Sequence, residues 1–435
     1  MARTTVEAAQ TVAALAGEVI DAPQRSWAQT TFDAFQFPVY RTLWLGSFFA
    51  FLSFNMAGTA QAVVAFDLTG SNRAVGTVMF GQGISMLLLN PFGGAIADRF
   101  SKRWLILVAQ LVIGGVMLAF AILITTGHIR ILFLAAGTFI TGTMFSFLGP
   151  TRTALLGDTV SPNRIGNAMA LMQVANNFGR IAGPFCAGPA LALIGSAGTY
   201  YLIASIFILV LITLSKLPDP PRVTRAGASV LEDVRGAIRY VVSRKRLLHA
   251  VLSFHLVMVI GFSNIVVMPG FAKDVLHSGN TGLGLLLGVS AAGGFVMSVI
   301  VASLADSRRA PLYLTICSFS AGVALIVVGF APTLALAALT MIFVSGGISG
   351  FQTLNNAFAL RLTEISYYGR VVGLIFMAWG MINLMSLPVG FFADAYGERT
   401  VLTGSGILLC ITVLLLALTR PPAEDDLPNV VQSTA

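Results

Sequence analysis

The stretch PFGGAIADRFSKR, residues 91–103, is a compact charged turn between two long apolar segments. Its charges are concentrated at the end, in DRFSKR from Asp98 to Arg103. Charged side chains are costly inside a lipid bilayer, so this turn is expected at a membrane face, with one spanning segment on each side of it.

Composition supports a membrane protein. Of the 435 residues, 56% are hydrophobic and 10% are charged, whereas a soluble domain carries roughly 25% charged residues. Apolar stretches of about 18–25 residues, each long enough to cross the hydrocarbon layer, recur along the chain. We predict twelve spans, at about 43–66, 75–97, 104–126, 131–151, 166–193, 199–216, 247–271, 282–305, 311–330, 332–355, 371–393 and 400–418.

These spans are expected to be helices. In lipid each segment must satisfy its backbone hydrogen bonds internally, and the runs lack the alternation of a β-barrel strand. The predicted fold class is therefore an all-α membrane protein with twelve transmembrane helices in two six-helix halves.

The positive charges predict the orientation. With the amino terminus in the cytosol, nearly all of the 26 Lys and Arg residues fall on the cytosolic side. The exceptions are Arg73, Arg130, Lys273 and Arg399 on the other side, and Arg180 within a span. This asymmetry follows the positive-inside rule for an even number of spans, so we expect a multi-pass protein of the inner or plasma membrane with both termini in the cytosol.

One long polar interruption divides the chain. We expect a cytosolic tail at 1–40, one half at 41–216, a cytosolic linker at 217–246, a second half at 247–419 and a cytosolic tail at 420–435. In the linker, SVLEDVRGAIRYVVSRKR has the pattern of an amphipathic helix on the membrane surface, or of a solvated linker helix. The halves match at one constant shift, which pairs Asn72, Gly76, Ala97 and Asp98 with Asn280, Gly284, Ala305 and Asp306. Such duplication favours a binding cavity between the halves, exposed alternately to either side.

The chain resembles the major facilitator superfamily of transporters over residues 40–420. The family signature G-x-x-x-D-R-x-x-x-R/K is filled by Gly94, Asp98, Arg99 and Arg103, with Lys102 as an extra charge. A degenerate second copy keeps Asp306, Arg308 and Arg309. The resemblance implies that this motif acts as a conformational switch holding the halves together on the cytosolic side. The alternative is that these residues serve only as topology charges.

A second motif favours export. The stretch GRIAGPFCAG is similar to the G-x-x-x-G-P-x-x-G-G element of antiporters in this family, through Gly179, Gly183, Pro184 and Gly188. The alternative is a close-packing site of the kind found in many membrane helices. Residues 149–171 and 231–248 resemble the branch with enterobactin exporters and macrolide efflux pumps. Many proton-driven exporters of this family carry an Arg inside the fourth helix. The corresponding position here is near Thr138, and the span has no Arg beyond Arg130 at its edge. The coupling mechanism of those exporters therefore does not transfer directly to this chain.

Few residues are candidates for contact with substrate or protons. Arg180 is expected to bind an anionic group or to pair with another charge, because ionisable groups inside a membrane usually face a cavity. The other candidates for substrate or coupling are Asp67, Asn176, Asn177, Gln352, Asn355 and His255. The amides could also serve as helix–helix hydrogen bonds, and His255 as a structural side chain.

Other function classes lack support. The sequence contains no phosphate-binding G-x-x-x-x-G-K-[ST] loop, no G-x-S-x-G and no H-E-x-x-H element. We therefore expect no enzyme, cofactor, metal or nucleic acid, and a monomer whose partners are the bilayer, protons and a small molecule. The favoured function is export of a siderophore, drug or metabolite by proton antiport. The alternatives are a lysophospholipid or lipid flippase, an uptake symporter, or a non-transporting sensor.

Overall fold

The computed structural model describes residues 32–161, 164–218, 230–304, 307, 309–364 and 367–422, and within these ranges all regular structure is helical. A short 3₁₀ helix, η1 (Asp33–Gln36), comes first. The N-terminal half then contains α3 (Pro38–Thr69), α4 (Asn72–Arg99), α5 (Lys102–Thr125), α6 (Ile131–Thr159), α7 (Ile165–Leu193) and α8 (Gly195–Leu214).

The C-terminal half follows a linker helix, α9 (Val230–Val242). Its first long segment runs through α10 (Lys245–Phe262), η3 (Ser263–Val267), α11 (Met268–Gly270) and η4 (Phe271–Val275). The remaining helices are α12 (Gly279–Ala302), α13 (Ala310–Phe330), α14 (Leu334–Arg361), α15 (Tyr368–Tyr396) and α16 (Glu398–Leu418).

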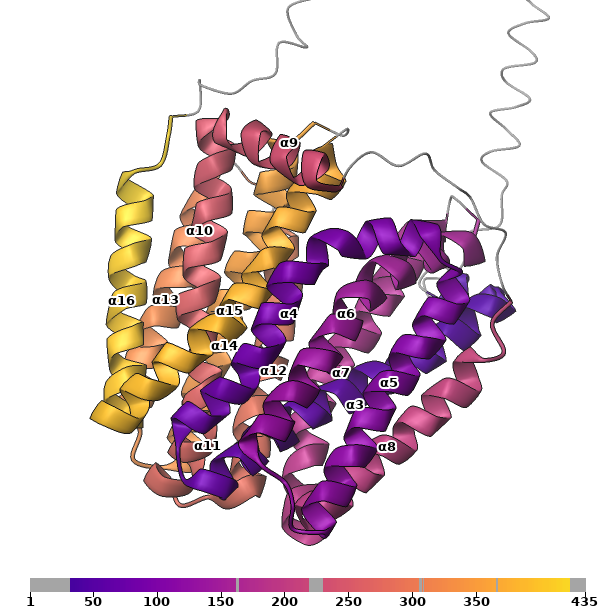
Figure 1. The fold of residues 1–435 in the computed structure, drawn as a ribbon. Coiled ribbons are helices and arrows are strands. Elements are labelled where there is room, and N and C mark those ends of the chain that lie inside the picture. Colours follow the sequence, from indigo (N-terminus) through magenta and orange to yellow (C-terminus); the bar gives the residue numbers. More distant parts are fainter. Residues whose placement is uncertain are drawn as a thin grey trace, which may run out of the picture.

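The two halves stand side by side, with α4 and α15 adjacent between them (Figure 1). We call the end of the bundle that carries α9 the α9 face, where α4 ends and α15 begins. The opposite end, where α4 begins and α15 ends, is the α11 face (Figure 1). The sequence predicts that the α9 face is cytosolic.

The predicted all-α membrane fold is confirmed. Every predicted span coincides with one of these helical segments to within a few residues at its ends, apart from α6 and α14, which run further. Within the described residues, ten segments are long and apolar enough to cross a membrane. The other two of the predicted twelve, α4 and α7, both lie against helices of the opposite half.

The seventh segment is the one that departs from a plain α-helix. Pro269 lies towards its end, within α11, and has no backbone N–H to donate, so an unbroken α-helical hydrogen-bond ladder cannot run through it. The chain accordingly changes to a 3₁₀ helix over Ser263–Val267 before α11, and then to a π-helix in η4. This irregular part ends at the α11 face (Figure 1).

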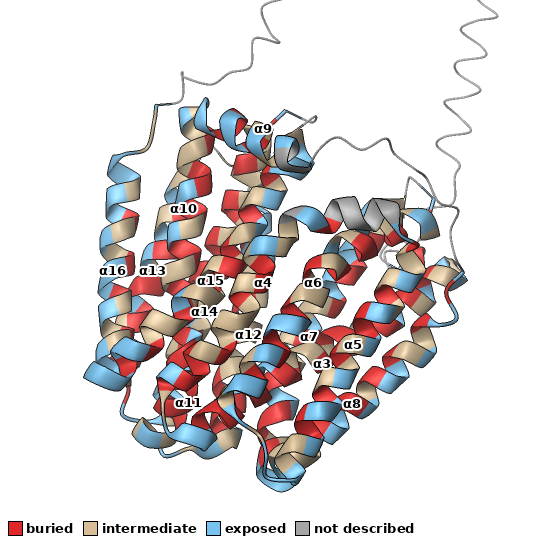
Figure 2. Cartoon of the chain, viewed as in Figure 1, coloured by how far each residue is buried: buried red, intermediate tan, exposed pale blue. Residues whose placement is uncertain are grey.

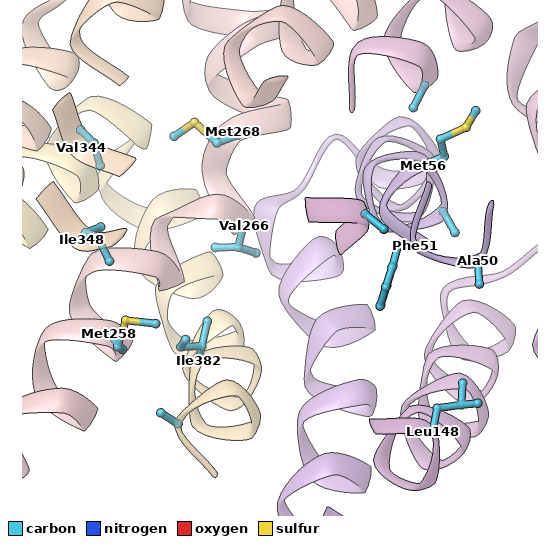
Figure 3. Packing of buried hydrophobic residues seen from close by; sticks show 14 of the residues in the cluster. Ala50, Phe51, Met56, Leu148, Met258, Val266, Met268, Val344, Ile348 and Ile382 are labelled. Atoms are coloured by element: carbon cyan, nitrogen blue, oxygen red, sulfur yellow. The ribbon is translucent and has the colours of Figure 1, made fainter. Parts of the chain in front are cut away.

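Apolar side chains fill the interior and also cover the outside. Buried residues line the helix faces that point into the bundle (Figure 2). Labelled core residues come from both halves, for example Phe51 and Met56 in one and Met258 and Ile348 in the other (Figure 3). Large apolar side chains such as Leu132 are exposed on the outside, as expected where lipid replaces water around the bundle.

The packed chain begins before residue 41. Asp33 is buried and forms an ion pair with Arg164, and the Ala34 N–H donates to Oδ1 of Asn167 at 2.9 Å. The last residues of the expected 1–40 tail thus pack against the start of α7. Residues 1–31 and 423–435 lie outside the described ranges.

The predicted linker helix is present as α9, although 219–229 lies outside the described residues. The face expected on the membrane is divided between two environments. Ala237 and Val241 are buried against the protein, whereas Ile238 and Val242 are exposed. The buried side is held by Tyr240, whose ring stacks on Tyr367 at 3.9 Å between centroids and whose hydroxyl accepts the N–H of Glu364 at 2.9 Å.

Candidate functional site

The candidate site is the junction between the halves, which α4 and α7 form with α15 and α12. Glycines let α4 and α15 approach closely. A Cβ added at Gly76 would lie 2.5 Å from the carbonyl oxygen of Ser386, and one at Gly83 would lie 2.7 Å from the backbone nitrogen of Leu384. Contacts this short tolerate no side chain, so the two backbones meet directly along this stretch.

The α7–α12 contact is built in the same way. A Cβ at Gly188 would lie 2.7 Å from the carbonyl oxygen of Asn280, and one at Gly284 would lie 2.6 Å from that of Pro184. Two residues of the predicted antiporter motif, Pro184 and Gly188, therefore pack across the junction. The other two pack within the N-terminal half, because Gly179 and Gly183 face the backbone of α3.

At the α11 face a carboxylate from one half caps a helix of the other. Asp394, near the end of α15, accepts the backbone N–H groups of Asn72 at 2.7 Å and Arg73 at 3.0 Å, as well as the hydroxyl of Ser71. These are the first N–H groups of α4, which lack partners inside the helix and favour a negative charge. Asp394 thus ties the start of α4 to the end of α15.

Neighbouring groups extend this closure. The side-chain amide of Asn72 donates to Oε1 of Glu398 at 2.8 Å, and the guanidinium of Arg73 lies 4.2 Å from the ring centroid of Phe391. Lys273 of the C-terminal half pairs with Asp67 of the N-terminal half. Asp67, predicted as a coupling candidate, therefore lies in an ion pair between the halves at the α11 face.

Toward the α9 face, α15 is not packed in this way. A Cβ at Gly369 or Gly373 would meet no atom within 4 Å. A Cβ at Gly390, near the other end of the same helix, would lie 2.5 Å from the carbonyl oxygen of Asn72. The described part of the junction is therefore closed at the α11 face, with open space beside the other end of α15.

A polar stripe runs along α7 in the middle of the junction. Gln173, Asn176, Asn177 and Arg180 follow helical spacing on the side of α7 away from the buried face formed by Ala175, Gly179 and Gly183. Nε2 of Gln173 donates to Oδ1 of Asn177 at 3.3 Å. The guanidinium of Arg180 lies 5.9 Å from the ring centroid of Trp379 on α15, a cation–π geometry across the halves.

The remaining polar candidates lie elsewhere. Asn355 is buried within the C-terminal half, where its amide donates to the carbonyl of Ala250 at 3.1 Å. Nδ1 of His255 lies 2.8 Å from the carbonyl oxygen of Val251 one turn earlier. Gln352 is half-buried on α14. No contact in the described residues brings these three to Arg180.

Several motif residues cannot be placed by their side chains. Gly94, Asp98 and Arg99 belong to α4, but their side chains lie outside the described part of the structure, as do Asp306 and Arg308. Lys102 pairs with Asp158 at 2.5 Å, and the guanidinium of Arg103 donates to the carbonyl of Ser215 at 2.6 Å. Both of these contacts stay within the N-terminal half, while Arg309 is exposed at the start of α13.

The roles of three residues do not follow from the sequence. No pattern predicts a contact for Asp394, although Gly390 and Asp394 repeat the spacing of Gly94 and Asp98. Trp379 carried no signal of its own in an aromatic-rich chain. Arg152 is among the cations that the sequence places on the cytosolic side, but its burial is not predicted, because the predicted span ends at 151 whereas α6 continues to Thr159.

Comparisons with known proteins agree with this architecture. Residues 43–385 match the family model described as Major Facilitator Superfamily. The chain is 24% identical to the staphyloferrin A transporter of Staphylococcus aureus, over 82% of this chain and 90% of that protein. It is 25% identical to the enterobactin exporter EntS of Citrobacter koseri, over 90% and 96%.

Solved structures show the same fold. The nucleoside transporter NupG superposes with a TM-score of 0.72 at 15% identity, covering 87% of this chain and 99% of that one. A bacterial homologue of the human lysosomal transporter Spinster, in an inward-facing and occupied conformation, gives a TM-score of 0.73 at 14% identity, covering 90% and 98%.

Proposed function

Since the chain belongs to the major facilitator superfamily, we propose that it is a secondary transporter that exports a small anionic organic molecule in exchange for protons. The observation that carries this proposal is Arg180, a cation on the polar stripe of α7, stacked on Trp379 of the opposite half. A guanidinium at the junction of two rocking halves can bind a carboxylate or another planar anion through two parallel hydrogen bonds.

The relatives support the choice of substrate. The names of two of them assign siderophores as their cargo, staphyloferrin A in one and enterobactin in the other. For this chain we propose a substrate of the same class, one that carries acidic oxygens for Arg180. Aromatic surface for its apolar parts is available at Trp379, which packs near Phe262 of α10.

The two ends of the α4–α15 pair supply the proposed switch. Asp394 closes the α11 face by capping α4. Asp98 lies one residue before the end of α4 with the same spacing from a preceding glycine, and the start of α15 is at the same face of the bundle. In the proposed cycle the Asp394 cap holds the cavity open to the cytosol, and an equivalent cap by Asp98 on α15 holds it open to the outside.

Asp67 is the proposed link to protons. Its carboxylate pairs with Lys273 across the halves at the α11 face. Protonation would remove the charge that attracts Lys273, so proton entry from the outside would favour opening of that face. In the proposed exchange the open face releases substrate and Asp67 accepts a proton from the outside. The proton is then released to the cytosol when the α11 face closes and Asp67 pairs with Lys273 again.

Transport into inside-out proteoliposomes tests the proposal. The panel contains a citrate-based siderophore, a catecholate siderophore, a macrolide and a lysophospholipid, each with and without an imposed pH gradient. We expect gradient-dependent accumulation of a siderophore by the wild type and its loss in Arg180→Gln. Accumulation of only the lysophospholipid would indicate a flippase. Substrate movement in the same direction as the protons would indicate an uptake symporter. Binding of a compound without its transport would indicate a sensor.

A further inference from the structure

Two arginines lie at the α9 face of the C-terminal half, away from the junction. Arg246 is the second residue of α10, and Arg420 follows the last residue of α16 by two positions. One turn deeper, Nε2 of His249 lies 2.9 Å from the carbonyl oxygen of Leu416, so the two helices touch there. Each arginine is one turn from this contact toward the same end of the bundle, and both side chains therefore leave adjacent helix ends (Figure 1).

Phe358 of α14 relates the two cations to each other. Its ring centroid is 5.7 Å from the guanidinium carbon of Arg246, and its side chain lines the same small cavity as Arg420. The pKa of Arg420 is lowered by burial and by the charge of Arg246. Two half-buried guanidiniums of the same sign thus repel each other here, and an anion between them would stabilise both.

Arg420 has donors that the described residues leave unused. None of the ion pairs in that part of the chain includes it. Its Nε is buried without a hydrogen bond, whereas its two terminal nitrogens also make no hydrogen bond but are not buried. A guest can therefore reach the terminal nitrogens. Their N–H groups form a planar fork that suits the oxygens of a phosphate.

The outer surface below the arginines is apolar and faces lipid. Leu252 on α10 and Leu415 and Leu418 on α16 are all exposed. Both helices are long and apolar enough to cross a membrane, so the cations at their α9-face ends lie at the level of the headgroups, and the leucines lie beside the acyl chains. This order from the surface inward matches a phospholipid better than a soluble phosphate.

We propose that Arg246 and Arg420 bind the phosphate of an anionic phospholipid in the leaflet at the α9 face, with its acyl chains along α10 and α16. The lipid offsets the repulsion between the two cations and bridges the ends of the first and last long helices of this half. The site is separate from Arg180, and the proposal does not depend on which molecule the protein transports.

The test is lipid binding by the purified full-length protein, measured by native mass spectrometry after delipidation in detergent. Phosphatidylglycerol, phosphatidylethanolamine and glycerol phosphate are titrated separately. We expect saturable binding of phosphatidylglycerol, weaker binding of the zwitterionic lipid, and no binding of glycerol phosphate, which lacks acyl chains. Equal binding of the two lipids would overturn the proposal, and binding of glycerol phosphate as tight as that of phosphatidylglycerol would replace it with a site for soluble phosphate.

Variants locate the site. Arg246→Gln and Arg420→Gln should each weaken phosphatidylglycerol binding about tenfold or more, because each removes a charged donor. Arg420→Lys should keep part of the affinity through its charge. The matched control is Arg309→Gln, an exposed cation before α13 at the same face, which should bind as wild type does. An equal loss in Arg309→Gln would show that binding depends only on overall charge, and would contradict the assignment.

An acidic segment of the chain is the competing occupant. Glu424, Asp425 and Asp426 follow Arg420 closely in sequence and lie outside the described ranges. A variant that combines Glu424→Gln, Asp425→Asn and Asp426→Asn should bind phosphatidylglycerol as tightly as wild type does. Binding by this variant and not by wild type would show that the acidic segment occupies the site, and would overturn the proposal.

Discussion

The two ends of α15 differ sharply in their surroundings. Near the α11 face Gly390 touches the backbone of α4, whereas near the α9 face Gly369 and Gly373 have no atom within 4 Å of an added Cβ. The same helix thus has one end built for contact with the other half and one end beside open space. For two halves that pivot about a common junction, this difference indicates which face is closed in this structure.

The largest expected effect comes from filling the packed end. In Gly390→Leu the new side chain would begin 2.5 Å from the carbonyl oxygen of Asn72, and overpacking against backbone typically costs about 1–3 kcal/mol or more. We expect the α11 face to be forced apart and substrate transport to be lost. The measurement is the labelling rate of a cysteine introduced at Ser71, which should rise strongly.

The same helix offers a matched control. Gly373→Leu adds an equal side chain where no atom lies within 4 Å, so the labelling at position 71 should stay at the wild-type rate. If both substitutions opened the α11 face equally, closure of that face would not depend on the close packing of α15 against α4 at Gly390.

The second prediction concerns substrate binding at the centre of the junction, where Arg180 lies, and not closure at its ends. Arg180→Gln keeps a polar side chain but removes the charge over Trp379. A hydrogen bond to a charged group contributes about 1.5–3 kcal/mol, so KM for an anionic substrate should rise about 10- to 100-fold. Arg180→Lys should retain part of the binding through its charge. A KM unchanged in Arg180→Gln would remove this residue from the substrate site.

The cap at Asp394 can be weakened without adding bulk. Asp394→Asn keeps the shape and loses the negative charge at the start of α4, and losing a helix cap costs about 0.5–2 kcal/mol. The ratio of molecules closed to molecules open at the α11 face should fall by a factor of about 2 to 30. Distances between spin labels on the ends of α4 and α15 would report the shift. The proposed counterpart, Asp98→Asn, should shift the population in the opposite direction.

Hydropathy and charge predicted the spans, the two halves and the linker helix because each depends on residues close together in the chain. The contacts of the junction depend on pairs far apart. Asp394 caps residue 72, and Arg180 meets Trp379, only after the halves dock. A local pattern could therefore identify Asp394 as part of a turn, and only its repeated spacing after Gly390 hinted at the cap.

Arg152 illustrates a different limit. A hydropathy window ends a span where charge appears, so it places a cation at the membrane surface by construction. In the structure α6 continues past this residue to Thr159, and its guanidinium lies over the ring of Phe51 on another helix. Burial of this kind depends on four helices meeting, which the sequence of any one of them does not reveal.

The smallest expected effect on closure of the α11 face is at the exposed ion pair. Asp67 has 43% of its side chain exposed in its pair with Lys273, and exposed pairs typically contribute about 0.2–1 kcal/mol. Lys273→Ala should therefore open the α11 face far less than Gly390→Leu does. Asp67→Asn should have an equally small effect on closure while abolishing uphill transport, because its proposed role is to carry a proton. Full uphill transport by Asp67→Asn would show that Asp67 takes no part in proton coupling. It would not affect the conclusion that the α11 face is closed in this structure.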